Sequence, residues 1–129
     1  MAGAFILSAV VTRSLKGAFH RNRPFVDYKF IYKKGSGGGY SFPSGHTSSA
    51  FCTATSITII FPKWYVAAPA YFWAASVGYA RIYQGVHYPT DVLAGALVGA
   101  GSSWLAHKGQ QWIERKSTKN KKLHPMAYL

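Results

Sequence analysis

Long apolar stretches alternate with short polar ones along this chain. Apolar and small residues dominate residues 3–16, 46–61, 64–82 and 90–107, and charged or turn-forming residues separate these stretches. Uninterrupted runs of this length are typical of helices buried in protein or in lipid. About 20 helical residues cross a bilayer core, so the last two stretches are long enough, the second is short and the first is a stub. The pattern predicts an all-α fold, a transmembrane bundle of about four helices.

The overall composition narrows the class of protein. The 129 residues contain 15 Lys+Arg against 3 Asp+Glu, a formal net charge of +12, yet only 14% of residues are charged and 49% are hydrophobic. A disordered chain has low hydrophobicity, and about a quarter of the residues in an ordinary soluble domain are charged. Two classes remain, a nucleic-acid-binding protein or a membrane protein.

The positions of the charges separate these two classes. Seven basic residues lie between Arg13 and Lys34, and six lie between Lys108 and Lys122. A nucleic-acid-binding domain would spread basic residues along an exposed face. We therefore expect the bilayer as a partner and no nucleic acid, with a soluble helical core as the alternative. Residues 1–107 are the predicted membrane-embedded domain, and residues 108–129 are the predicted basic cytoplasmic tail, lying against anionic lipid heads.

Helices that cross the bilayer in alternation bring distant polar residues to one side. The end of the first helix, the start of the second, the end of the third and the start of the fourth all fall on that side. The polar groups there are Lys16, Arg21 and Arg23; Pro43, Ser44, Gly45 and His46; and Arg81, His87 and Asp91. Converging cations, imidazoles and a carboxylate predict an anion site with acid–base groups.

The residue types at this side suit a phosphate group. The sequence Ser-Gly-His at 44–46 begins a predicted helix, whose free N–H groups and positive dipole end favour an anion. A simple Ser N-cap explains the same residues and stays open at this stage. Arg23 and Arg81 can each bind two phosphate oxygens with the guanidinium fork, and Lys16 adds a point charge.

The spacing of His87 and Asp91 suggests how the phosphate would react. A carboxylate four residues away can hold one ring nitrogen of His87 while the other nitrogen attacks phosphorus. His46 can then protonate the leaving oxygen as a general acid. With three acidic residues in all and Cys52 as the single cysteine, a metal ligand set is hard to assemble. We therefore expect no metal and no cofactor.

These three groups resemble the motifs of the type 2 phosphatidic acid phosphatase superfamily, which also includes bacterial undecaprenyl pyrophosphate phosphatases. The family pattern is Lys-x6-Arg-Pro, then Pro-Ser-Gly-His, then Ser-Arg-x5-His-x3-Asp. It is matched here by Lys16, Arg23 and Pro24; by Pro43, Ser44, Gly45 and His46; and by Arg81, His87 and Asp91. Three spaced motifs in the family's order are far more specific than any single one.

The resemblance implies a metal-independent membrane lipid phosphatase that works through a phosphohistidine. In that reading His87 attacks phosphorus, Asp91 orients it and His46 protonates the leaving group. The phosphoryl oxygens would be bound by Lys16, Arg23, Ser44, Gly45 and Arg81. The substrate would be a lipid diphosphate or monophosphate, such as an isoprenoid pyrophosphate or a phosphatidate-like lipid. The site would face the periplasm or the outside, which puts the tail in the cytoplasm.

The chain departs from the family pattern in two ways. Ala80 stands where the family has Ser before the third-motif Arg, which removes one hydroxyl contact. Membrane members also have six spanning helices, so this chain resembles the C-terminal part of such an enzyme or a minimal member. It would then associate with the missing helices. Gly95 and Gly99, four residues apart, indicate close helix packing within the chain, with homodimerisation as the alternative.

Two other functions remain open at the level of sequence. A phosphotransferase on the same scaffold would pass the phosphoryl group to an acceptor other than water. A catalytically silent, truncated membrane protein would only bind anionic lipid through its basic ends.

Overall fold

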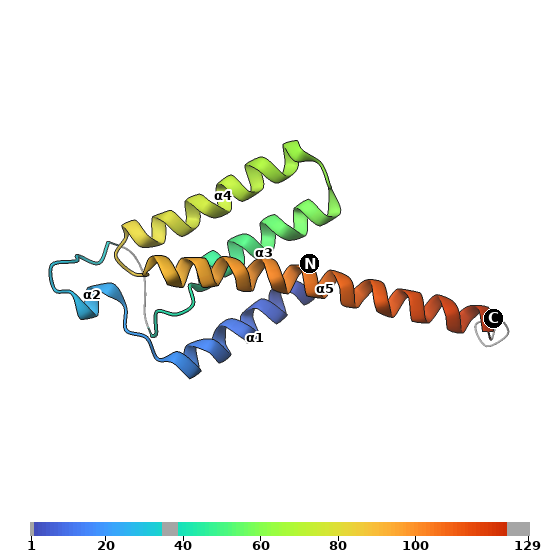
Figure 1. The fold of residues 1–129 in the computed structure, drawn as a ribbon, viewed down its shortest axis with the longest axis horizontal. Helices are drawn as coiled ribbons and strands as arrows, with labels where there is room; N and C mark the ends of the chain where they lie inside the picture. The colour runs from blue at the N-terminus through green and yellow to red at the C-terminus, as the bar shows by residue number, and fades with distance from the viewer. Residues whose placement is uncertain (1, 35–38, 124–129) are drawn as a thin grey trace.

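The computed structural model describes residues 2–34 and 39–123, and within them it contains helices and no strands (Figure 1). Four long helices and one single-turn helix make up the fold, which confirms the all-α prediction. They are α1 (Ala2–Phe19), α2 (Pro24–Asp27), α3 (Gly45–Ile60), α4 (Trp64–Tyr83) and α5 (Pro89–Leu123).

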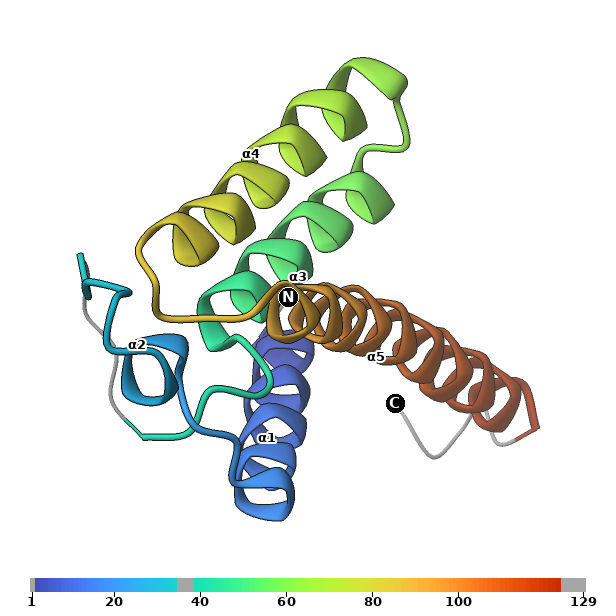
Figure 2. The ribbon, with the colours of Figure 1, turned by 60° about the vertical axis from the view of Figure 1, so that its left-hand side comes forward.

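Helix α3 lies at the centre of the bundle. It packs against α1, α4 and α5, and α1 also packs against α5. Helices α1 and α4 flank α3 on opposite sides and do not touch each other (Figure 2). The bundle is therefore an α3–α5 pair with one further helix on each side.

Small residues let α3 and α5 approach closely. A Cβ atom added to Gly95 would lie 2.5 Å from the carbonyl oxygen of Ser44, and one added to Gly99 would overlap the carbonyl oxygen of Ser48. A Cβ at Gly101 would meet nothing within 4 Å. The predicted stripe at 95 and 99 therefore packs within the chain, and its face is occupied by α3 rather than open to a second copy.

Buried hydroxyl groups add hydrogen bonds between the helices. The Ser8 and Ser48 hydroxyls lie 2.5 Å apart and join α1 to α3, and Thr12 donates to the same Ser48 oxygen over 3.3 Å. The Ser56 and Ser103 hydroxyls, 2.8 Å apart, join α3 to α5. Such bonds between small polar residues are typical of helix packing in membranes, where hydrophobic burial does not drive helices together.

The outside of the bundle is apolar. Phe72 is 76% exposed, Leu97 69% and Ile6 66%, and exposed apolar surface of this extent marks a contact with lipid or with other protein. Among the described residues, one segment is long and apolar enough to cross a membrane by itself, Ala2–Asp27, with a mean hydropathy of 1.2. This segment joins α1 and α2. The apolar exterior and this segment suggest a location in the membrane.

Two helices run further than their apolar stretches predicted, and one helix was missed. Helix α1 continues to Phe19 rather than 16, and α5 continues to Leu123 rather than 107. The predicted ends followed the loss of apolar residues, but residues 108–123 are rich in Gln, Glu, Lys and Arg, which are good helix formers. At 35 residues, α5 is about 50 Å long, and its C-terminal part extends beyond the other helices (Figure 1). The short α2 begins at Pro24, a residue suited to a first helical turn.

Candidate active site

The residues of the three motifs meet at one end of the bundle. There α1 ends, α3 begins, α4 ends and α5 begins (Figures 1 and 2). The alternating path of the helices brings these four ends together, as the sequence analysis predicted. Residues 39–44, which lead into α3, and residues 84–88, between α4 and α5, complete the site.

His87 lies buried in the loop before α5, with 2% of its surface exposed. The Nη1 atom of Arg23 donates to the Val86 carbonyl over 3.0 Å and lies 3.2 Å from Nε2 of His87. A guanidinium can only donate hydrogen bonds, so Nε2 must accept and the imidazole proton must sit on Nδ1. The contact thus assigns the tautomer of a neutral His87 and places a lone pair on Nε2.

The Nδ1 side of His87 faces a hydroxyl and a carboxylate. Ser41 Oγ lies 3.5 Å from Nδ1 and Asp91 Oδ2 lies 3.6 Å from it, and the Ser41 hydroxyl donates to Asp91 Oδ2. Burial lowers the pKa of His87 below its ordinary value, Asp91 opposes this shift, and the charge of Arg23 adds to it. His87 is therefore neutral, and the lone pair of its Nε2 faces Arg23.

Asp91 is fully buried in the first turn of α5 and is held on both of its oxygens. Arg21 Nη1 lies 2.9 Å from Oδ1, and the Tyr88 backbone N–H donates to Oδ2 over 2.7 Å. The Asp91 carbonyl oxygen also accepts from the Ser44 N–H over 3.0 Å. This last bond ties the start of α5 to the start of α3.

Arg23 and Lys16 are fixed by the backbone of the segment before α3. Arg23 Nε donates to the Gly39 carbonyl over 3.2 Å and Nη2 to the Tyr40 carbonyl over 3.4 Å. Lys16, in the last turn of α1, donates to the same Tyr40 carbonyl over 2.9 Å. Backbone carbonyls thus set the direction of both cations.

Ser44 acts as the N-cap of α3. Its hydroxyl accepts from the Thr47 N–H over 3.4 Å and lies 2.9 Å from the Thr47 hydroxyl, and Ser44 is completely buried. The side chain is thus engaged in capping, the alternative left open above. Gly45 has open space at its Cβ position, and His46 is exposed. These two residues present the first turn of α3 to solvent.

Arg81 completes the ring of cations from the last turn of α4. It is 7% exposed, and its Nη1 donates to the Gln84 side chain over 3.1 Å. Arg81, Arg23 and Lys16 all lie close enough to His46 to act on its imidazole electrostatically. All eight residues predicted for the site therefore lie at this end of the bundle.

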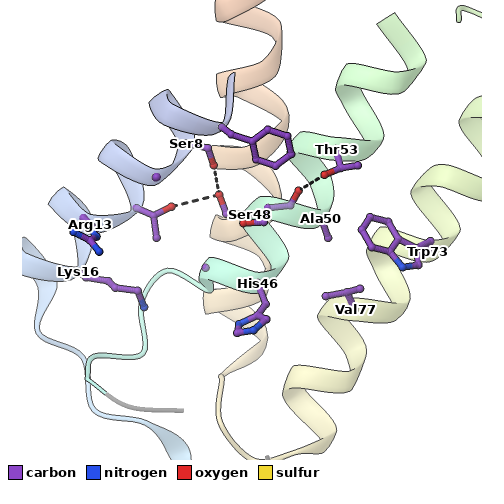
Figure 3. Close-up of a pocket in the computed structure, with 14 residues that line it drawn as sticks. Ser8, Arg13, Lys16, His46, Ser48, Ala50, Thr53, Trp73 and Val77 are labelled. Atoms are coloured by element: carbon purple, nitrogen blue, oxygen red, sulfur yellow. Dashed lines mark hydrogen bonds between the residues drawn. The ribbon is translucent and has the colours of Figure 1, made fainter. Parts of the chain in front are cut away.

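A pocket of about 650 Å³ opens beside these residues, between α1, α3 and α4 (Figure 3). Its polar end is formed by Lys16, Gly45 and His46. Its apolar walls are Phe5, Ala9, Ala50, Trp73 and Val77, and Arg13 and hydroxyl side chains of α1 and α3 also line it: Ser8, Thr12, Ser48, Ser49 and Thr53. The other five predicted site residues do not line this pocket: Arg23, Ser44, Arg81, His87 and Asp91.

Arg21 and Ser41 lie beside Asp91 in the structure, and neither was assigned a role from the sequence. Arg21 was counted among the cations of this side, and Ser41 was not considered. Their signal in the sequence is weak, since they lie two residues before Arg23 and two before Pro43 in irregular segments. Within the described part of the chain, no three His, Cys, Asp or Glu side chains come together in a way that could hold a metal ion.

Comparison with known proteins places this geometry in context. The family model described as the PAP2 superfamily matches residues 1–115. The lipid A 4'-phosphatase of Bacteroides thetaiotaomicron is 37% identical over 89 residues, which cover 66% of this chain and 40% of that protein. The undecaprenyl-diphosphatase of Sulfolobus acidocaldarius is 32% identical over 111 residues, 80% of this chain and 50% of that protein.

Two solved structures share the fold. The crystal structure of Aquifex aeolicus LpxE matches with a TM-score of 0.76 and 35% identity, over 83% of this chain and 64% of that one. The transmembrane PAP2 type phosphatidylglycerolphosphate phosphatase of Bacillus subtilis matches with a TM-score of 0.72 and 29% identity, over 85% of this chain and 57% of that one. The chain thus spans about two fifths to one half of the curated relatives named above, and a larger share of these structures.

Proposed function

Since this chain belongs to the PAP2 superfamily, we propose that it hydrolyses a phosphate ester or diphosphate of a membrane lipid through a phosphohistidine on His87. The observation that carries the proposal is the contact of Arg23 with Nε2 of His87, 3.2 Å long. It pairs a neutral imidazole, whose Nε2 lone pair faces Arg23, with a guanidinium that can bind phosphate.

The reaction follows from this pair. A bound phosphoryl group attracts Arg23 Nη1 to its oxygens, which frees the Nε2 lone pair. Nε2 attacks phosphorus, so that a P–N bond forms while the bond from phosphorus to the leaving oxygen breaks. A protonated His46 gives its proton to that oxygen. Water then attacks the phosphohistidine and gives a proton to the now neutral His46, while the P–N bond breaks, the electron pair returns to Nε2 and phosphate is released.

The charges around the site would stabilise the transition state. Arg23, Arg81 and Lys16 provide positive charge where the three phosphoryl oxygens gain negative charge, which is how proteins accelerate phosphoryl transfer. The first turn of α3, at Gly45, adds N–H groups and the positive end of the helix dipole. Ser44 caps this turn, and it stays among the residues predicted to bind the phosphate.

The pocket supports a lipid as the substrate rather than a soluble phosphate ester. It leads from Lys16 and His46 along apolar side chains of α1, α3 and α4 (Figure 3). A phosphorylated headgroup at the polar end would leave its hydrocarbon chain against these walls. An isoprenoid diphosphate and a phosphatidate-like lipid both have this form, and the relatives include enzymes named for lipid A and for undecaprenyl diphosphate.

The proposed orientation places the site on the periplasmic or outer side and residues 108–129 in the cytoplasm. The family resemblance supports this orientation. The site and the C-terminal end of α5 lie at opposite ends of the bundle (Figure 1), so one of the two faces the cytoplasm if the bundle spans the bilayer. Residues 124–129 of the predicted tail are outside the part that the structure describes.

Phosphate release from defined lipids tests the proposal. The detergent-purified chain is assayed with EDTA present on undecaprenyl diphosphate and on phosphatidate, beside His87→Ala and a His107→Ala control. We expect turnover that His87→Ala reduces by at least about 10⁴-fold, as for loss of a nucleophile, and that His107→Ala leaves unchanged. A folded wild-type chain without turnover would contradict the proposal, and transfer to an added alcohol in place of phosphate release would indicate a phosphotransferase.

A further inference from the structure

Arg21 and Ser41 contact Asp91 and have no role in the proposed binding of the phosphate. We propose that they are positioning residues, which hold the His87 nucleophile in its reactive tautomer and direction by acting through Asp91. This inference rests on the proposed function and adds two residues to its machinery. The Ser41 hydroxyl lies against both His87 and Asp91.

Asp91 and Ser41 both lie at the limit of hydrogen-bond reach from His87. Nδ1 and Asp91 Oδ2 are 3.6 Å apart, longer than an ordinary hydrogen bond, so the carboxylate by itself holds the ring loosely. The Ser41 hydroxyl lies beside both atoms: it donates to Asp91 Oδ2, and its oxygen is 3.5 Å from Nδ1. Since the hydroxyl proton is given to Asp91, the Ser41 oxygen is free to accept the Nδ1 proton. Ser41 thus bridges the carboxylate and the imidazole.

Burial makes this bridge hard to replace. Ser41 and Asp91 are 0% exposed and His87 is 2% exposed. A buried N–H group that loses its acceptor is destabilised, because water does not reach it. Without the hydroxyl, the Nδ1 proton keeps only the Asp91 oxygen, 3.6 Å away, so the ring is held less firmly in the direction from which Nε2 attacks phosphorus.

Arg21 fixes the orientation of the Asp91 carboxylate. Its Nη1 lies 2.9 Å from Oδ1 and donates to the Thr90 hydroxyl over 2.6 Å, while the guanidinium lies 4.6 Å from the centre of the Tyr88 ring. Three contacts set the plane of the guanidinium. With Oδ1 bound by Arg21, the other oxygen is directed at Ser41 and at the Tyr88 N–H. The ion pair is therefore unlike a solvated surface pair, since its acidic partner is fully buried.

Arg21 also balances the charge near His87. The charged groups around the imidazole are Asp91 from α5, Arg81 from α4, Arg23 before α2 and Arg21 through Asp91. Loss of Arg21 leaves the Asp91 charge less neutralised, which favours protonation of His87. The acidic limb of the rate profile should then move to higher pH in Arg21→Met. Asp91 is the nearest carboxylate in this set, so Asp91→Asn should cancel the shift.

Kinetics of matched variants provide the first test. We expect Ser41→Ala and Arg21→Met to lower kcat about 10- to 100-fold, in the range found for groups that orient a ligand or nucleophile. KM should stay within about twofold of wild type, because neither residue has a role in the proposed binding of the phosphate, and Arg21→Lys should recover part of kcat. The controls are Lys29→Met, the same charge loss on an exposed residue after α2, and Ser76→Ala, an exposed hydroxyl of α4. An unchanged kcat, or a loss confined to KM, would overturn the inference.

Imidazole NMR provides a readout that needs no turnover. With ¹⁵N-labelled histidine, and His87→Gln to assign the signal, wild type should show His87 protonated on Nδ1. Ser41→Ala should move the Nδ1–H resonance of His87 upfield, because the proton loses its hydroxyl acceptor, and Ser76→Ala should not. If wild type releases no phosphate but this resonance moves, the proposed function fails while the positioning by Ser41 stands. If the Nδ1–H resonance is the same in Ser41→Ala, the bridge is wrong whatever the activity.

Discussion

Basic residues occupy two ends of this molecule in opposite settings. At the site, Arg23 is 6% exposed and Arg81 7% exposed, and acceptors on the protein fix their directions. At the far end of α5, Arg115 and Lys119 are exposed on a helix that extends beyond the bundle. Removing a cation from water costs several kcal/mol, whereas an exposed cation keeps its hydration. The contrast shows that burial and fixed direction, not charge alone, separate the basic residues with a proposed chemical role from the others.

A matched pair of substitutions tests this contrast most strongly. Arg23→Met removes a buried guanidinium that contacts His87, and we expect phosphate release to fall about 10²- to 10³-fold, as when a fixed transition-state donor is lost. Arg115→Met removes the same charge from the exposed end of α5, and activity should stay within about twofold. Initial rates of phosphate release on one lipid in detergent measure both. Equal losses would mean that net charge, not position, governs the site.

A second pair of substitutions tests the close packing of α3 against α5 at Gly95 and Gly99, which we call the seam. In Gly99→Val the added carbon would overlap the Ser48 carbonyl oxygen, so the helices must separate. We expect a loss of about 1–3 kcal/mol in the free energy of unfolding. Gly101→Val, in open space on the same helix, should change stability by less than about 1 kcal/mol. Thermal unfolding in one detergent compares the two, and similar midpoints would argue against a close seam.

The pH dependence of kcat/KM tests the environment of the buried His87. Burial lowers the pKa of His87, so the ring stays neutral and nucleophilic below its ordinary value of 6.5. The acidic limb of kcat/KM that belongs to His87 should therefore lie below pH 6.5. Asp91 opposes the shift, so Asp91→Asn should move the limb to still lower pH. Both profiles are measured on one substrate, so that the titration of the substrate itself is the same in wild type and in Asp91→Asn. An acidic limb that moves to higher pH in Asp91→Asn would contradict its assignment to His87.

The smallest effect is expected at the exposed end. Lys116 lies 5.1 Å from the centre of the Trp112 ring and is exposed, as is Lys119. Replacing both lysines with Gln should change the free energy of unfolding by less than about 1 kcal/mol, since exposed charges contribute little. Thermal unfolding of the double variant at low and at moderate salt measures this. A loss as large as that of Gly99→Val would show that the extension packs against something.

The helices of the core could be predicted closely because apolar runs mark them. The prediction of 46–61 and 64–82 compares with Gly45–Ile60 and Trp64–Tyr83 in the structure. The end of α5 was placed at 107 because apolar patterning reports burial and lipid contact, not backbone hydrogen bonding. A helix that leaves its neighbours keeps its hydrogen bonds and loses only its apolar face.

The site was predictable in its members but not in its connections. Alternating helices carry Lys16, Arg23, His46 and His87 to one end whatever the loops do. That Ser41 lies between His87 and Asp91 depends on the path of residues 39–44, and no periodicity encodes the path of an irregular segment. The capping role of Ser44 depends on a rotamer, which the motif does not specify either.

The seam between α3 and α5 separates the alignment of the site residues from the shape of the pocket walls. Two contacts fix the start of α3 against the start of α5. They are the hydrogen bond from the Ser44 N–H to the Asp91 carbonyl and the close approach of the helices at Gly95. The facing walls of the pocket come from α1 and α4, which do not touch each other. Under the proposed function, the parts of α1 and α4 that lie away from Lys16 and Arg81 can diverge in evolution to admit different lipids while the groups on α3 and α5 keep their alignment. Selection on lipid preference should then act on side chains such as Phe5 and Trp73, and selection on turnover on the seam and on the site ends of the helices.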